Sequence, residues 1–278
     1  MKIACVQMTS ACDPADNLPI IAARVKQAAA QSARLVALPE TCSFMEKNRK
    51  AMHSRLENQA DSQVLAALCH MAKENGIFLL IGSMILAEEN SDKAVNRSLL
   101  IAPNGTVQAQ YDKIHMFDVA LENGESHHES AAYQAGDKLV VTKADGVSLG
   151  LSICYDLRFP ALYRRLAEAQ AQVIFVPSAF TKQTGAAHWH ILLRARAIET
   201  GCFIVAPAQI GVHENGRETY GHSLIIDPWG KIIAEAASED KVIVAALDMT
   251  LVDKARRQIP ALFHGATYRL PEGRQGQD

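Results

Sequence analysis

Short apolar runs alternate along the chain with longer segments in which apolar residues recur at helical spacing. The short runs are typical of buried strands, and the longer segments are typical of helices that pack one face on a sheet. Strand-like runs flank the turns Pro103-Asn-Gly105 and Pro228-Trp-Gly230, which predicts a hairpin at each turn. We predict strands at residues 3–8, 34–38, 77–85, 98–102, 106–111, 147–153, 173–176, 202–206, 224–227, 231–234 and 242–247, and helices at residues 17–33, 61–75 and 186–200 and after Pro160.

This order of elements predicts an α/β fold. Hairpins mixed with strand–helix–strand units argue against one all-parallel sheet and favour two sheets enclosed between layers of helices. The sequence contains no linker, repeat or low-complexity segment, so residues 1–270 are expected to form a single domain. Residues 271–278 are polar enough to form a disordered tail. We expect loops at residues 119–134, 181–187 and 209–220.

The most informative single position is Cys154, where the apolar run of residues 147–153 ends. Pro160 opens a helical pattern soon afterwards, so the thiol is expected at a sharp turn between a strand and a helix. Such a turn presents its side chain beside backbone N–H groups, which suits a nucleophile. The alternative is that Cys154 is a small buried apolar residue, which is the common role of a free cysteine.

Two ionisable residues also stand where apolar strands end. Glu40 follows Leu38-Pro39, and Lys113 follows the strand at residues 106–111. Each by itself could be a solvated charge, but strand ends are where reacting groups collect in layered α/β folds. A carboxylate can take the thiol proton and deliver it to a leaving amine, and an ammonium can stabilise an oxyanion. Together with Cys154, these residues predict acyl transfer through a thioester.

Composition excludes several other classes of function. The 278 residues include 28 Lys and Arg against 30 Asp and Glu, a net charge of −2, which argues against nucleic-acid binding. No apolar run is long enough for a membrane span, and we expect no signal peptide, because residues 1–7 lack its longer apolar core. The six cysteines lack disulfide or metal spacing, so we expect free thiols in a reducing compartment and a cytoplasmic location.

Two histidine pairs are the remaining candidates for a metal site. His127 and His128 are adjacent, and His188 and His190 flank a tryptophan, but neither pair has zinc spacing or a third ligand nearby in the sequence. No Gly-rich nucleotide-binding motif is present. We therefore expect no metal and no cofactor, and we assign these histidines to polar loop or helix-surface positions.

The motifs around Glu40, Lys113 and Cys154 resemble those of the nitrilase, or carbon–nitrogen hydrolase, superfamily. The resemblance extends from Lys2-Ile-Ala-Cys-Val-Gln7 to about Pro260, nearly the whole chain. It implies a four-layer α-β-β-α sandwich and a catalytic Glu–Lys–Cys triad formed by these three residues. An enzyme of this class is a hydrolase of linear amides that needs no cofactor.

The same resemblance implies a further catalytic glutamate after the lysine. We place it at Glu129, with Glu122 and Glu125 as neighbouring alternatives. True nitrilases usually carry Cys-Trp-Glu at the nucleophile, whereas this chain has Cys154-Tyr-Asp156. Nitrile hydrolysis is therefore disfavoured.

Further segments resemble the Nit group of amidases, at residues 154–160, 177–180, 188–189, 192–199 and 220–230. Within that group the chain is most similar to amidases of deaminated glutathione. The resemblance implies hydrolysis of the side-chain amide of a small 2-oxo acid conjugate, with release of ammonia. An ω-amidase that acts on α-ketoglutaramate is the near alternative. A non-catalytic binding scaffold with a redox-sensitive Cys154 is the alternative from another class.

Four residues beside these motifs are candidates for substrate binding: Tyr155, Arg158, Phe180 and Lys182. A dicarboxylate amide carries a negative charge away from its scissile carbonyl. We expect Arg158, Lys182 or Arg217 to bind that charge, and the sequence leaves open which of them does.

The resemblance also implies a homodimer or a larger assembly of dimers. The matching segment is the helix expected at residues 186–199, together with the turn after Cys154. Trp189, Leu192, Leu193 and Ala197 give that helix an apolar side suited to an interface, although an ordinary core contact would explain them as well.

Overall fold

Alternate residues of the first two strands point into two separate apolar cores. In β1 (Lys2–Val6), Ile3 and Cys5 belong to one core, whereas Ala4 and Val6 belong to the other. The strand β2 (Leu35–Ala37) divides its residues in the same way. Because side chains alternate between the faces of a sheet, a sheet buried on both faces reads as a continuous apolar run. This burial explains the short uninterrupted runs in the sequence.

The structure is a computed structural model that describes residues 1–88, 91–121, 124 and 126–266. In its first sheet β1, β2 and β3 are parallel neighbours, and the remaining pairs are antiparallel. Strands from both ends of the chain meet there. The order is β16 (Val242–Ala246), β1, β2, β3 (Phe78–Ala87), β4 (Ala94–Ile101) and β5 (Val107–Asp112).

The second sheet repeats this plan, with three parallel strands in the middle and antiparallel strands on both sides. Its order is β15 (Ile232–Glu235), β14 (Leu224–Ile226), β11 (Phe203–Ala206), β10 (Val173–Phe175), β9 (Val147–Leu151) and β8 (Val141–Ala144). Two short hairpins stand apart from the sheets. They are β6 (Asp118–Ala120) with β7 (Ser126–His128), and β12 (Ile210–Val212) with β13 (Glu218–Tyr220).

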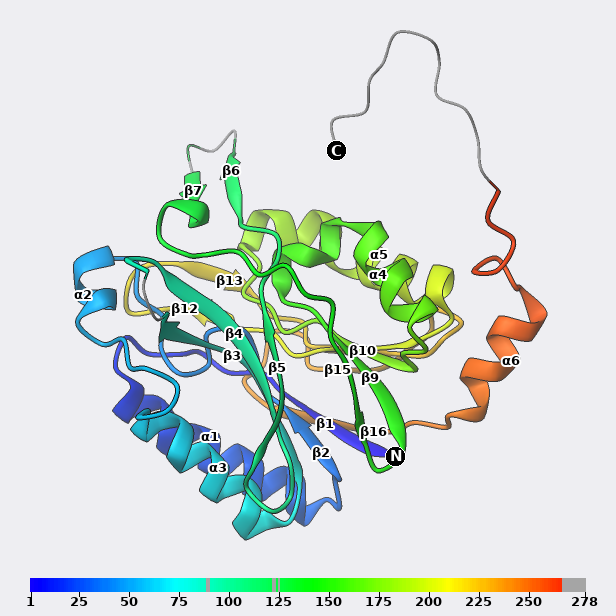
Figure 1. Cartoon of the computed structure of the whole chain (residues 1–278), viewed down its shortest axis with the longest axis horizontal. Helices are drawn as coiled ribbons and strands as arrows, with labels where there is room; N and C mark the ends of the chain where they lie inside the picture. The colour runs from blue at the N-terminus through cyan, green and yellow to red at the C-terminus, as the bar shows by residue number, and fades with distance from the viewer. Residues whose placement is uncertain (89–90, 122–123, 125, 267–278) are drawn as a thin grey trace, which may run out of the picture.

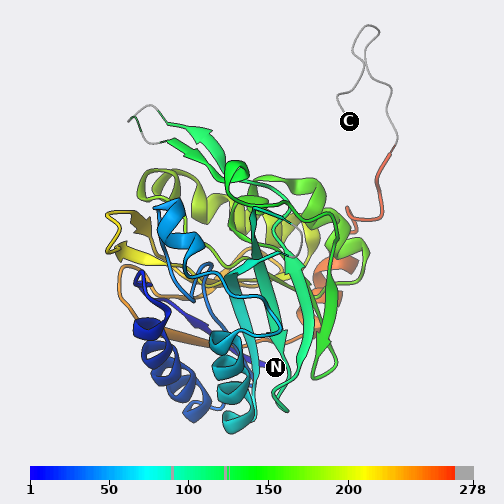
Figure 2. The same cartoon turned by 60° about the vertical axis from the view of Figure 1, so that its left-hand side comes forward.

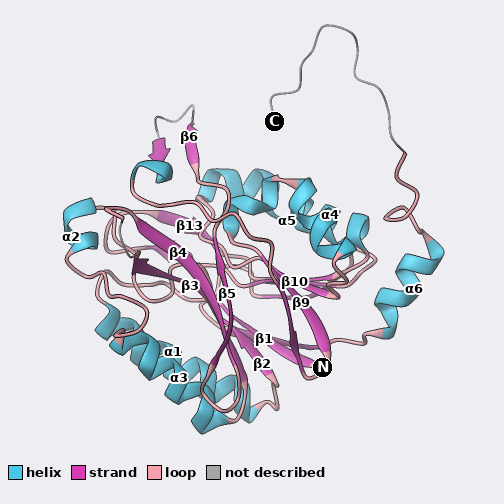
Figure 3. Ribbon diagram, viewed as in Figure 1, coloured by secondary structure: helices cyan, strands magenta, loops and turns pink. Residues whose placement is uncertain are grey.

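Helices cover the outer faces of both sheets (Figures 1 and 2). Helices α1 (Pro14–Ala30) and α3 (Gln63–Asn75) lie on the first sheet, and α4 (Pro160–Glu168) and α5 (Lys182–Thr200) lie on the second. Figure 3 shows the strands enclosed between these helical layers. The predicted α/β fold with α-β-β-α layers is therefore confirmed. The other helices are α2 (Arg49–His53), α6 (Thr250–Gln258) and the 3₁₀ helices η1 (Glu129–Ala131) and η2 (Cys154–Arg158).

The segments predicted as loops contain regular structure, so those predictions are wrong. Residues 119–134 include most of the β6–β7 hairpin and η1, and residues 209–220 include the β12–β13 hairpin. Helix α5 begins at Lys182, because the Thr181 side chain caps it and accepts a hydrogen bond from the Thr184 N–H. These short elements depend on caps and long-range partners that apolar periodicity does not reveal.

Two further predictions concern the domain boundary and the C-terminal tail. The single domain at residues 1–270 stays a prediction. The tail at residues 271–278 lies outside the described residues. No helix in the described part of the chain is both long enough and apolar enough to cross a membrane.

Candidate active site

Cys154 lies where β9 has ended and η2 begins, at the turn that the sequence predicts. Its backbone has φ +50°, a left-handed conformation that a residue with a side chain adopts only when its surroundings enforce it. One such constraint is a hydrogen bond in which the Cys154 N–H donates to the Pro177 carbonyl oxygen at 2.9 Å. The side chain is only 7% exposed, so the thiol lies inside a pocket and not on an open surface.

Asp156 fixes the turn that carries this thiol. The Asp156 carboxylate is fully buried, and its Oδ2 accepts hydrogen bonds from the Ile153 N–H at 2.8 Å and the Tyr111 hydroxyl at 2.6 Å. Its Oδ1 accepts a hydrogen bond from the His115 N–H at 3.1 Å. Tyr111 lies in β5 and His115 follows that strand, so one buried carboxylate ties the nucleophile turn of one sheet to the strand end of the other.

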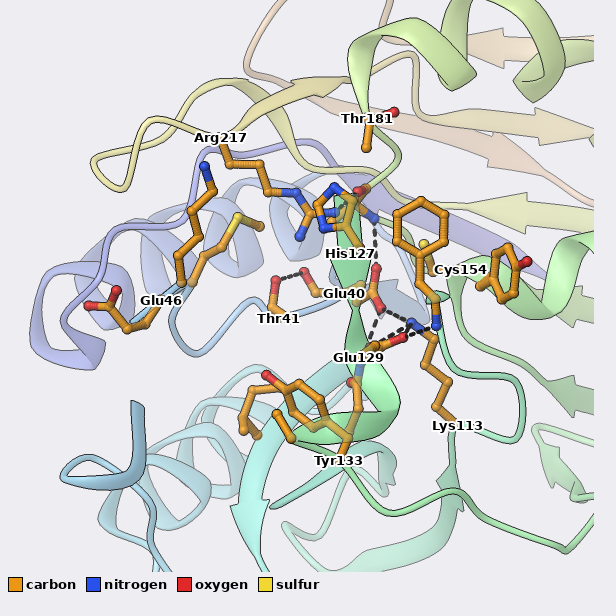
Figure 4. A pocket seen from close by; sticks show the side chains of 18 of the residues that line it. Glu40, Thr41, Glu46, Lys113, His127, Glu129, Tyr133, Cys154, Thr181 and Arg217 are labelled. Atoms are coloured by element: carbon orange, nitrogen blue, oxygen red, sulfur yellow. Dashed lines mark hydrogen bonds and ion pairs between the residues drawn. The ribbon is translucent and has the colours of Figure 1, made fainter. Parts of the chain in front are cut away.

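Glu40 follows β2 and is 4% exposed, with both carboxylate oxygens hydrogen-bonded. Its Oε2 accepts a hydrogen bond from the Ala179 N–H at 2.9 Å. Its Oε1 accepts hydrogen bonds from the Lys113 Nζ and the Asn96 Nδ2, each at 3.0 Å. These donors come from three separate segments, so the carboxylate is held in one orientation within the pocket (Figure 4).

Lys113 follows β5, and its ammonium lies between two carboxylates. Besides Glu40, it contacts Glu129, with Nζ 2.9 Å from Oε1 and 2.8 Å from Oε2. Glu129 in η1 is held in turn by the Phe117 N–H, which donates to Oε2 at 2.6 Å. The structure therefore brings Glu129 to the site, as predicted, whereas Glu122 and Glu125 lie outside the described residues.

The charges in this cluster determine which groups hold protons. Burial raises the pKa of Cys154, and the negative charge of Glu40 raises it further, so the resting thiol keeps its proton. Burial opposes ionisation of Glu40, yet the nearby Lys113 ammonium holds the Glu40 pKa below its ordinary value. Burial likewise opposes the charge on Lys113, but Glu129 and Glu40 raise the Lys113 pKa well above normal. The site thus pairs a protonated thiol with an ionised carboxylate.

The cluster lies in a cavity of about 220 Å³ whose lining includes Cys154, Tyr155, Arg158 and Phe180. The Arg158 guanidinium lies over the Phe180 and Tyr155 rings, 5.3 and 5.9 Å from their centroids. This volume is small for a ligand pocket, so it suits a small amide and not a folded polypeptide. Three of the four predicted substrate-binding residues therefore line the cavity.

Lys182 is the predicted residue that the structure does not bring to the cavity. It starts α5, and its Nζ forms an exposed ion pair with Glu218 at 3.0 Å. Arg217 does line the cavity, and its Nη2 donates to the Ala179 carbonyl oxygen. The Arg217 Nε is buried and has no hydrogen-bond partner in the described part of the chain.

Asn96 is a site residue that sequence reasoning missed. It lies within the buried strand β4, and its Nδ2 reaches both Glu40 Oε1 at 3.0 Å and Glu129 Oε1 at 3.5 Å. Its Oδ1 is buried and has no hydrogen-bond partner among the described residues. A buried amide is costly unless its groups are hydrogen-bonded. The strand predicted at residues 98–102 begins after Asn96, and the polar Arg97 and Ser98 follow it, so the sequence contains no clear signal of its burial.

Comparison with known proteins decides the family. The model of the carbon–nitrogen hydrolase family matches residues 2–257. The chain belongs to the carbon–nitrogen hydrolase family. A deaminated glutathione amidase from Synechocystis sp. is 40% identical over 264 residues, which cover 94% of this chain and 96% of that protein.

Solved structures agree with this assignment. The NitFhit protein of C. elegans superposes with a TM-score of 0.87 at 33% identity, covering 95% of this chain but only 64% of that longer one. Nit3 of Saccharomyces cerevisiae, a member of branch 10 of the nitrilase superfamily, gives a TM-score of 0.84 at 29% identity and covers 94% of both chains. This carbon–nitrogen hydrolase is therefore an amide-hydrolysing enzyme, and the non-catalytic alternative is wrong.

Proposed function

We propose that this enzyme hydrolyses deaminated glutathione through a thioester on Cys154. The observation that carries the proposal is the buried network in which Glu40 and Glu129 enclose the Lys113 ammonium beside the thiol. The name of the Synechocystis relative, which is similar over nearly its whole length, supports the choice of substrate.

In the first half-reaction, the Cys154 sulfur attacks the amide carbon while Glu40 accepts the thiol proton. The carbonyl oxygen becomes an oxyanion. The Lys113 ammonium has three N–H donors, and two of them can serve the flanking carboxylates. The third remains for the oxyanion, together with the backbone N–H that follows the nucleophile.

Collapse of this intermediate breaks the C–N bond. Glu40 gives its proton to the departing nitrogen and leaves an acyl thioester on Cys154. In the second half-reaction Glu40 takes a proton from water, whose oxygen attacks the thioester carbon, and the thiolate recovers the proton as the acid product leaves. Glu129 holds Lys113 in place and touches no reacting atom in this scheme, so we assign it a positioning role.

Arg217 is the cation that we assign to the substrate carboxylate distant from the scissile bond. Its buried Nε–H has no partner among the described residues, whereas Lys182 is exposed and paired with Glu218. Figure 4 shows the Arg217 guanidinium directed towards Glu40. A buried donor without a partner costs free energy, and a substrate carboxylate would supply the missing acceptor. Arg158, packed over two aromatic rings, is the second candidate.

The test is a comparison of substrates with the wild type and Cys154→Ala. Deaminated glutathione carries a 2-oxo acid joined by an amide to the amino group of its cysteine, so its leaving group is an amine, and the release of ammonia expected from the sequence is wrong for this substrate. The alternative substrate, α-ketoglutaramate, releases ammonia instead. Both yield 2-oxoglutarate, which can be assayed directly. We expect kcat/KM to be highest for deaminated glutathione and far lower for plain aliphatic amides. A preference for aliphatic amides or nitriles would contradict the substrate assignment and leave the thiol mechanism intact.

Paired variants separate the candidate cations. Arg217→Gln should raise KM and lower kcat/KM by about 10–100-fold, as expected for loss of a charge-assisted contact. Lys182→Gln removes a nearby cation outside the cavity and should change kcat/KM less than twofold. Equal losses in both variants would contradict the assignment to Arg217.

We also propose that the chain forms homodimers through the outer face of α5. The side of α5 that the sequence predicted to be apolar packs largely in the chain's own core, because Trp189, Leu193 and Ala197 are at most 1% exposed. The opposite face presents Ile191 and Ile198, which are 70% and 55% exposed. Exposed apolar residues grouped on one face favour an interface. Light scattering at micromolar concentration should give twice the mass of the chain or a multiple of it, and a monomer would contradict the proposal.

A cytoplasmic location stays part of this proposal. All six cysteines are free thiols, including Cys5, Cys42 and Cys202 in the buried core. Free thiols are usual in a reducing compartment, where disulfides do not persist.

A further inference from the structure

Outside the cavity, two imidazoles and a carboxylate from three distant segments converge. His190 lies on α5, His222 precedes β14, and Glu235 ends β15. Glu235 Oε1 lies 3.0 Å from His190 Nε2 and 2.8 Å from His222 Nδ1. The three potential ligand atoms all lie within 4.8 Å of one another. Among the described residues, no other group of three His, Cys, Asp or Glu side chains is as close.

The backbone around His222 holds its imidazole in place. His222 has φ +55°, a left-handed conformation that is uncommon for residues other than glycine. Its N–H donates to the Ala237 carbonyl oxygen at 3.0 Å, and its own carbonyl oxygen accepts a hydrogen bond from the buried Trp189 Nε1 at 2.7 Å. Its ring stacks on Tyr220, with centroids 4.3 Å apart. The fold therefore fixes the position of the His222 imidazole and of its Nδ1 atom.

Helix α5, which carries His190, is docked closely against the same segment. A Cβ atom at Gly185 would lie 2.3 Å from the Tyr220 Cβ, so only glycine permits this approach. The His190 ring lies edge-on to both Tyr220 and His222, with centroids 6.1 and 5.2 Å away. The helix and the segment before β14 thus present their histidines to one point in space.

The donor set is one that zinc favours. Zinc and similar ions bind imidazole nitrogen and carboxylate oxygen atoms. Three protein ligands also leave a fourth coordination position for water. Zinc bonds of about 2.0–2.1 Å in a tetrahedral site place ligand atoms about 3.3 Å apart. The two distances to Glu235 would therefore open by only a few tenths of an ångström. The side chains are 31%, 23% and 33% exposed, so an ion can enter from solvent.

We propose that His190, His222 and Glu235 form a binding site for a divalent transition-metal ion, zinc, separate from the catalytic cavity. The ion would join α5 to the β14–β15 hairpin and to the segment before it. Because the ion binds only where the fold assembles all three ligands, it stabilises the folded chain. It takes no part in amide hydrolysis.

Calorimetric titration with Zn²⁺ tests the site directly, after the purified enzyme has been treated with EDTA and dialysed into buffer with a thiol-free reductant. We expect about one ion per wild-type chain. His190→Gln and Glu235→Gln should each weaken binding at this site by about 100-fold or more. His70→Gln is the matched control, because His70 Nε2 pairs with Glu74 at 3.1 Å on α3 without a third ligand in the described part of the chain. That control should bind zinc as the wild type does.

Thermal unfolding gives a second, independent measurement. Zinc at about 100 times its Kd should raise the Tm of the wild type and of His70→Gln by about 5 °C. The Tm of His190→Gln and Glu235→Gln should not change on adding zinc, while their metal-free Tm shows that they fold. Absence of zinc binding by the wild type, or undiminished binding in both site variants, would overturn the proposal. The second result would place the ion on other groups, such as the partly buried thiols of Cys12 and Cys69.

Discussion

Two clusters of ionisable side chains on this chain differ chiefly in their exposure to water. In the cluster that we propose to be catalytic, Lys113 and Glu40 are 2% and 4% exposed, and the ammonium neutralises neighbouring carboxylates. In the outer cluster His190, His222 and Glu235 are about one quarter to one third exposed, and two imidazoles face one carboxylate. Both assemble from segments far apart in the sequence, yet only the first is closed to solvent.

The difference indicates which chemistry each cluster suits. A buried ion network keeps fixed charges where water cannot reorganise around them, which favours proton transfer and stabilisation of an oxyanion. A solvent-exposed cluster whose nitrogen and oxygen atoms can coordinate a metal favours binding of an ion from solvent. Similar substitutions in the buried cluster and elsewhere on the chain should therefore differ in their effect on the rate.

Loss of the nucleophile should have the largest effect. Cys154→Ala should lower kcat by about 10⁴-fold or more, because no other group can form the acyl intermediate. Folding should be retained, since the change removes only one buried sulfur. Cys69→Ala makes the same change at a partly buried thiol on α3 and should leave kcat within about twofold. Formation of 2-oxoglutarate measures both rates, and substantial turnover by Cys154→Ala would refute the mechanism.

The catalytic base should come next. Glu40→Gln should lower kcat by about 10²–10⁴-fold, because an amide cannot accept and return a proton. The same substitution at Glu235 in the outer cluster should leave kcat within about twofold. Steady-state kinetics of the two variants under identical conditions test the contrast. Similar losses in both variants would mean that the two clusters are not functionally separate.

Removal of the oxyanion donor should have a smaller effect on rate. Lys113→Ala should lower kcat by about 10²–10³-fold. It should also lower the free energy of unfolding by about 3–5 kcal/mol, since the buried Glu40 carboxylate and the partly buried Glu129 carboxylate lose their counter-ion. Lys241→Ala breaks the exposed pair with Glu239 and should change neither quantity measurably. Kinetics and urea unfolding measure both variants, and a normal rate in Lys113→Ala would exclude the donor role.

The pH dependence of stability should show the smallest effect. The folded chain holds the Glu40 pKa below its ordinary value of 4.5. The stability gained from this ionisation is therefore complete above pH 4.5 and is lost as the pH falls through the folded pKa. The difference in free energy of unfolding between wild type and Glu40→Gln should shrink on acidification, by at most about 1.4 kcal/mol per pH unit. Urea unfolding between pH 7 and pH 3 measures this difference, and a constant or growing difference would argue against a lowered pKa.

The sequence predicts much of the catalytic cluster because its members stand at strand ends. Glu40 and Cys154 follow β2 and β9, which belong to the parallel strands at the centre of each sheet, where reacting groups collect at strand ends. Lys113 follows the edge strand β5, which runs in the same direction as β3 because both pair antiparallel with β4. Asn96 escaped prediction because it lies inside β4, and its contact with Glu40 depends on how β4 lies between β3 and β5. Sheet register is a long-range property that local periodicity does not contain.

Lys182 and His190 also have contacts that local sequence patterns do not predict. Lys182 is close in sequence to Phe180, which lines the cavity, but the cap at Thr181 starts a helix that directs Lys182 to Glu218. His190 has no third metal ligand among its neighbours in the sequence, which is why we predicted no metal site there. The structure supplies Glu235, 45 residues away, through the docking of α5 on the β14–β15 hairpin. Local patterns thus predict elements and their ends, but not the partners that packing provides.

The most direct test of the central claim is detection of the acyl-enzyme on Cys154. Metal-free enzyme is mixed with a slowly hydrolysed substrate amide, quenched in acid within one turnover, and digested for mass spectrometry. The account predicts that the 2-oxo acyl mass appears on the peptide containing Cys154 and disappears as the product forms. Acyl mass on a different cysteine, or turnover that proceeds with no acylated peptide at any quench time, would contradict it.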